Sequence, residues 1–68
     1  MDMKDWWDAA FQALERAPLV GLTVDVIRGA NFCSMKVYRN EEQIGAVWEE
    51  GGHLCSNLST SDLLLLLP

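Results

Sequence analysis

Apolar residues near the start of the chain recur at the spacing of an α-helix, with charged and amide side chains on the opposite side. Aspartates crowd the beginning of this segment, where the helix dipole favours negative charge. Pro18 ends it, because the residue before a proline is pushed out of helical geometry. We therefore predict a helix from Asp5 to Ala17, with Trp6 at the edge of its apolar stripe. The predicted core-facing stripe is Met3, Trp7, Ala10, Phe11, Leu14 and Ala17.

From Leu19 onward the hydrophobic period changes to two, which is typical of strands with one buried face. Three such runs are separated by two short turn signals, Gly29-Ala30 and Asn40-Glu41. A glycine in the first position of a two-residue loop suits a type II′ hairpin turn. The second signal is weaker, because glutamate tolerates a positive φ poorly. The pattern predicts three antiparallel strands, which end near Arg28, Arg39 and Glu49.

These two turns also predict which residues lie opposite one another. Two-residue loops place Val24 opposite Met35, and Met35 opposite Ala46. All the apolar residues then share one face, whereas a slip of one residue would turn a strand's apolar set to the other face. The predicted core face of the sheet is Leu22, Val24, Val26, Cys33, Met35, Val37, Ile44, Ala46 and Trp48.

The C-terminal part of the chain predicts two further elements. Gly51-Gly52 suits a third hairpin, which would place Cys55 opposite Trp48 on a fourth edge strand. Ser59 and Asp62 have the spacing of a helix-capping box, followed by five leucines up to Leu67. These leucines either cover an open end of the core or form a homodimer contact. The predicted fold is a single α+β domain over residues 1–68, with an N-terminal helix packed on a three- or four-stranded antiparallel meander and a short leucine-rich C-terminal helix.

A chain this short has a thin core, so we expect single core residues to matter strongly. We predict that Phe11→Ala destabilises the protein by ~3–5 kcal/mol. The side chains expected to be largely buried are Trp7, Phe11, Leu14, Val24, Val26, Met35, Val37, Ile44 and Trp48.

Charge narrows the possible partners. Ten acidic and five basic residues give a net charge of −5, which disfavours nucleic-acid phosphates and anionic membranes as ligands. The charge permits binding to a basic protein, including one whose groove normally holds nucleic acid. No basic segment followed by an apolar run begins the chain, and the leucine run is far shorter than the ~20 residues of a membrane-spanning helix. We expect a cytoplasmic protein.

The sequence contains no recognisable catalytic or metal-binding pattern, so we expect neither enzymatic activity nor a cofactor. His53 is the single histidine, and no serine or cysteine lies in a nucleophile motif. Cys33 and Cys55 would lie two strands apart, ~9.5 Å, which exceeds the reach of a disulfide. We expect both thiols to be reduced. Glu49, Glu50, His53 and Cys55 match no standard zinc spacing.

Two surfaces emerge as candidates for partner binding. The predicted topology gathers acidic residues at one end of the sheet, which we call the acidic end: Asp2, Asp5, Asp8, Glu49 and Glu50. Glu41 and Glu42 fall at the opposite end. The face of the sheet away from the helix, which we call the open face, carries apolar and aromatic residues: Ile27, Phe32 and Tyr38. Simple helix-dipole complementarity and solvated turns would also explain the acids, and scattered exposed apolar residues are normal.

In size, charge and order of elements the chain resembles small, acidic, phage-encoded inhibitors of the anti-CRISPR type. That class shares no residue motif, so the resemblance transfers no functional residue. It implies stoichiometric inhibition of a larger, host-defence complex, without catalysis. The alternative is a homodimeric adaptor, which docks through the open face and the leucine run. The sequence leaves both a monomer and a homodimer open.

Overall fold

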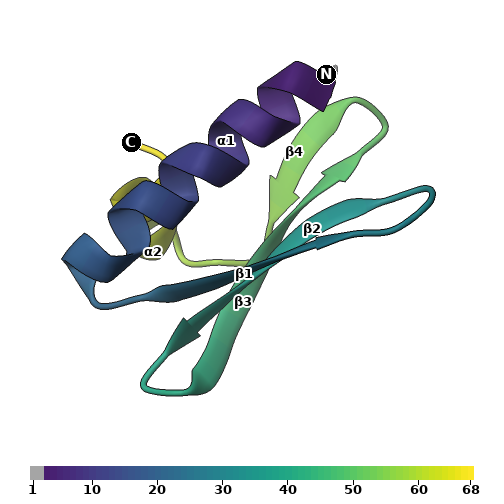
Figure 1. Cartoon of the computed structure of the whole chain (residues 1–68). Helices are drawn as coiled ribbons and strands as arrows, with labels where there is room; N and C mark the ends of the chain where they lie inside the picture. The colour runs from purple at the N-terminus through teal and green to yellow at the C-terminus, as the bar shows by residue number, and fades with distance from the viewer. Residues whose placement is uncertain (1–2) are drawn as a thin grey trace.

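The computed structural model describes residues 3–68, and describes Met3 by its backbone only. Four strands form one antiparallel sheet in chain order, and both helices lie on the same side of it (Figure 1). This is the predicted α+β fold, with the meander four-stranded. The elements are α1 (Met3–Arg16), the 3-10 helix η1 (Ala17–Val20), β1 (Thr23–Arg28), β2 (Cys33–Arg39), β3 (Glu42–Glu50), β4 (His53–Ser56) and α2 (Thr60–Leu66).

Helix α1 packs on the sheet through a face that matches the predicted stripe only in part, because Ala10 and Ala17 are buried as predicted. Its buried stripe is Trp6, Ala10, Ala13 and Ala17. Phe11 is 61% exposed and Leu14 42% exposed, so their predicted burial was wrong. The two stripes share Ala10 and Ala17, so the helix is rotated by less than the ~100° that separates neighbouring residues. The chosen stripe consists largely of alanine, which lets the helix backbone approach the sheet closely, while Trp6 fills the remaining space.

The first hairpin turns one residue later than predicted. Gly29 N donates to the carbonyl of Phe32 at 2.9 Å, so the turn lies between these two residues. The register therefore moves by two, and Val26 lies opposite Met35. A shift of two keeps every side chain on its predicted face. Gly29 does not have a positive φ; a Cβ there would lie 2.1 Å from the Phe32 ring, so glycine makes room for that ring.

A β-bulge between β2 and β3 changes the predicted faces of β3. The Asn40-Glu41 turn forms as predicted, with both residues at positive φ and Arg39 opposite Glu42. The register then shifts by one, leaving Ile44 as the extra residue. Gly45 and Val47 consequently lie against the helices, whereas Ala46 and Trp48 lie on the open face. The predicted core positions of Ala46 and Trp48 were therefore wrong.

The third hairpin confirms the predicted pairing of Trp48 with Cys55 across Gly51-Gly52. Because of the bulge, this pair belongs to the open face. Cys33 is buried on the helix-covered face, next in alternation to Met35. The two cysteines are free, and they lie on opposite faces of the sheet.

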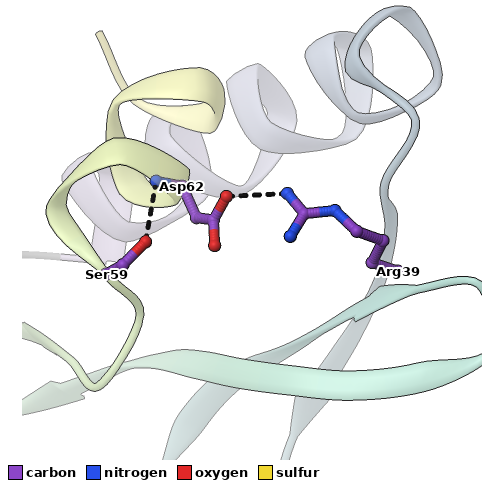
Figure 2. Close-up of polar contacts among 3 residues, drawn as sticks. All are labelled: Arg39, Ser59 and Asp62. Atoms are coloured by element: carbon purple, nitrogen blue, oxygen red, sulfur yellow. Dashed lines mark hydrogen bonds and ion pairs between the residues drawn. The ribbon is translucent and has the colours of Figure 1, made fainter.

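Helix α2 starts as the sequence predicts and is tied to its neighbours by polar contacts. Ser59 Oγ accepts from Asp62 N at 3.2 Å, and Arg39 Nη2 donates to Asp62 Oδ1 at 2.7 Å (Figure 2). Arg16 Nε donates to the carbonyl of Leu65 at 2.6 Å, which fixes α2 beside α1. Leu66 is fully buried. The leucine run thus covers one end of the core within the chain.

The core joins α1, α2 and the covered face of the sheet. Met35 and Val37 are fully buried as predicted. Four other residues predicted to be largely buried are only partly buried and pack against the core: Trp7, Val24, Val26 and Ile44. The buried residues are Trp6, Ala10, Ala13, Ala17, Leu22, Cys33, Met35, Val37, Val47 and Leu66.

Candidate protein-binding surfaces

The structure places four of the five predicted residues of the acidic end on elements at one end of the molecule. Asp5 and Asp8 are exposed in the first turns of α1. Glu49 and Glu50 close β3 at the hairpin with β4, which Figure 1 shows at the same end as the start of α1. Asp2 lies outside the described residues. The Asn40-Glu41 turn lies at the other end of the sheet, as expected.

Contacts within the chain involve the carboxylates of this end. Glu49 Oε1 accepts from Gly52 N at 2.8 Å, which stabilises the hairpin turn. Glu50 Oε2 accepts from the indole Nε1 of Trp48 at 3.2 Å. Asp8 lies 3.8 Å from Lys4 Nζ in an exposed pair along the helix. Glu49 and Glu50 therefore have local structural roles in the β3–β4 hairpin.

The open face carries more apolar surface than the sequence predicted, because the bulge adds Trp48 to it. The register aligns Ile27, Ser34, Trp48 and Cys55 in one row across all four strands, each half-buried. Tyr38 lies on the same face and is half-buried as well.

Phe32 lies at the margin of the open face rather than within it. The residue precedes β2 in the first hairpin, where its ring packs over Gly29 and remains 54% exposed. Of the three residues predicted for this face, Ile27 and Tyr38 therefore lie on the sheet itself. The open face gains Trp48 and Cys55, which the sequence reasoning had assigned to the core.

A third surface was missed, and it lies on α1. Trp7, Phe11 and Leu14, which we call the helix strip, follow one another at helical spacing. The rings of Trp7 and Phe11 lie 5.9 Å apart between centroids, with an angle of 34° between their planes. The signal was present in the sequence: α1 carries two apolar stripes, and only one can face the sheet.

Residues 3–68 line shallow hollows, two of which lie as follows. One, of about 300 Å³, lies between β3, β4 and α2 and is mostly apolar. The other, of about 240 Å³, lies at the β1–β2 hairpin beside Glu49. Among residues 3–68, no group of three or more histidine, cysteine or carboxylate side chains is placed to hold a metal ion. Within the same range, no helix combines the length and apolar character needed to cross a bilayer.

Comparisons with protein-family models, with curated protein sequences and with solved structures gave no match to this chain.

Proposed function

We propose that this protein is a small acidic binding domain that inhibits a larger protein by stoichiometric association, without catalysis and without a cofactor. The observation that supports the proposal is the placement of Asp5, Asp8, Glu49 and Glu50 at one end of a chain whose net charge is −5. We place it in the cytoplasm. The proposed partners include complexes of the host-defence type, whose basic clefts bind nucleic acid.

The physical basis is electrostatic. Carboxylates held at one end of a compact body present a negative field in place of a phosphate backbone. Exposed charges of this kind act mainly on the rate of association and on its salt dependence. A basic cleft occupied in this way is closed to its nucleic acid, so binding alone inhibits.

A matched pair of double variants tests the proposal. Asp5→Asn with Asp8→Asn removes two charges from the acidic end, and Glu41→Gln with Glu42→Gln removes two from the opposite end. Once a partner has been identified by cross-linking and mass spectrometry, stopped-flow mixing at several salt concentrations measures association. We expect the first double variant to slow association and flatten its salt dependence more than the second. Equal effects would mean that net charge alone matters, and would contradict a defined acidic end.

The second candidate function is a homodimeric adaptor, and the position of Trp48 on the open face favours it. Buried tryptophan and tyrosine are frequent anchors of protein interfaces. Sedimentation velocity distinguishes the two functions. A dimer that persists in high salt and dissociates on Trp48→Ala or Tyr38→Ala supports the adaptor, whereas a monomer with salt-sensitive partner binding supports the acidic inhibitor.

A further inference from the structure

We infer that the helix strip, Trp7, Phe11 and Leu14, is a docking surface for a basic amphipathic helix of a partner protein. The inference rests on the proposed function, because it names the partner chemistry that an acidic binding domain would recognise. The acidic end alone would attract a partner only through charge, and the helix strip adds an apolar contact.

The strip has the geometry of a helix-binding ridge. Its members lie at positions i, i+4 and i+7, so they follow one line along ~10 Å of α1. Phe11 is 61% exposed and Leu14 42% exposed. Trp7 is half-buried, and its ring packs against the ring of Phe11. Aromatic side chains at the centre of such a surface are the residues that most often dominate binding energy.

The fold itself leaves this strip unfilled. α1 faces the sheet through Trp6 and three alanines. Arg16 binds the carbonyl of Leu65, so α2 occupies the flank of α1 on which Arg16 lies. Helical geometry of ~100° per residue places the strip on the flank opposite Arg16. Neither the sheet nor α2 therefore covers it.

Charge decides which occupant fits. Asp8 and Glu15 are exposed and border the strip on its solvent side, and the one lysine there, Lys4, is already paired with Asp8. A second copy of this chain would bring these carboxylates against their equivalents, with a net charge of −5 on each copy. A helix with an apolar stripe flanked by lysine or arginine instead matches both the strip and its border.

The test uses a synthetic peptide of about 15 leucine and lysine residues in amphipathic helical order, a length at which helices begin to be stable. Isothermal titration against the full chain measures its dissociation constant. We expect Phe11→Ala to weaken binding about tenfold or more. Leu64→Ala is the matched control, because Leu64 is a similarly exposed apolar residue (55%) on α2. We expect it to change binding less than twofold.

Several outcomes would overturn the inference. They are equal binding by Phe11→Ala and the unmodified chain, equal binding of a peptide with glutamate in place of lysine, or self-association in sedimentation that Phe11→Ala abolishes. Thermal melts of each variant verify folding, which an exposed residue should not affect. If Phe11→Ala has no effect while Asp5→Asn with Asp8→Asn reduces binding, the helix strip fails but the proposed acidic function stands.

Discussion

Trp6 and Phe11 show how differently two aromatic side chains of one helix contribute to stability. Trp6 is fully buried and Phe11 mostly exposed. We predict that Trp6→Ala lowers the free energy of unfolding by ~3–5 kcal/mol. For Phe11→Ala we now predict a loss below ~1 kcal/mol, in place of the larger loss that burial would have implied. Urea denaturation monitored by circular dichroism measures both, and a larger loss for Phe11→Ala would contradict the observed helix face.

Trp6→Phe serves as the control for this comparison. Within the described part of the chain, the buried indole Nε1 of Trp6 has no hydrogen-bond partner. Phenylalanine removes this unpaired donor, which offsets part of the lost volume. We therefore expect Trp6→Phe to cost much less than Trp6→Ala.

Asp62 gives the molecule a defined response to acid. The Arg39 hydrogen bond, followed by the Ser59 hydrogen bond, lowers the pKa of the Asp62 carboxyl below its usual value of 3.8. A carboxyl with a lowered folded-state pKa stabilises the fold above its unfolded pKa, and that contribution is lost as the pH falls through the folded pKa. We expect unfolding free energy measured from about pH 6 to pH 2 to fall less steeply below about pH 4 for Asp62→Asn than for the unmodified chain. Parallel curves would contradict this assignment.

At the scale of the element, Gly45, which follows the extra residue of the bulge, leaves room for the segment between β4 and α2. A Cβ at this position would lie 2.7 Å from Leu58 Cδ2 and 2.9 Å from Asn57 Oδ1. We predict that Gly45→Ala lowers the free energy of unfolding by ~1–3 kcal/mol, because the segment between β4 and α2 must move. Chemical denaturation measures the loss. A variant that is more stable than the unmodified chain would contradict this prediction, because it would show that the segment can move without loss of free energy.

A matched substitution at the preceding turn should have the opposite sign. Glu41 has a φ of 68°, a region that disfavours side chains with a Cβ. We expect Glu41→Gly to raise the free energy of unfolding by up to ~1 kcal/mol, since Asn-Gly is the preferred pair for such a turn. The same denaturation assay compares the two variants, and destabilisation by Glu41→Gly would contradict the turn geometry.

Elements that depend on neighbouring residues were predictable from the sequence, and those that depend on distant contacts were not. The cap of α2 and the Asn40-Glu41 turn follow from a few adjacent residues, and both are confirmed. The bulge depends on residues further along the chain, since Ala46 N donates to Asn57 Oδ1 at 2.7 Å and Ser56 Oγ donates to Ala46 O at 2.9 Å. The alternation of apolar and polar residues within β3 therefore cannot predict the bulge.

The candidate surfaces divide in the same way. The acidic end needed only the connectivity of helix and hairpins, so its described members lie where the sequence placed them. The helix strip was assigned to the core because its spacing fits a buried stripe as well as that of Trp6 and Ala13 does. Only packing against the sheet selects between two stripes of equal period.

At the scale of the whole molecule, α2 completes a core that one helix and one sheet leave open. Leu66 is fully buried among residues of α1 and the sheet. We predict that Leu66→Ala lowers the free energy of unfolding by ~2–5 kcal/mol, a large share of the stability of so small a domain. Leu64→Ala, on the exposed side of the same helix, should change it by less than ~0.5 kcal/mol. Equal losses in thermal or chemical unfolding would mean that α2 is not anchored through Leu66.

Because the two thiols lie on opposite faces of the sheet, the rates of their chemical modification can also be used to measure local opening of the structure. Cys33 is buried at the base of the hollow beside the β1–β2 hairpin, so we expect an alkylating reagent to reach it mainly on local opening, whereas Cys55 is half-exposed on the open face. The ratio of their modification rates therefore reports the equilibrium between closed and locally opened states without any introduced label. A ligand that clamps α1 against the sheet would slow the alkylation of Cys33 alone, so each molecule carries both the probe of its breathing motion and the internal reference for it.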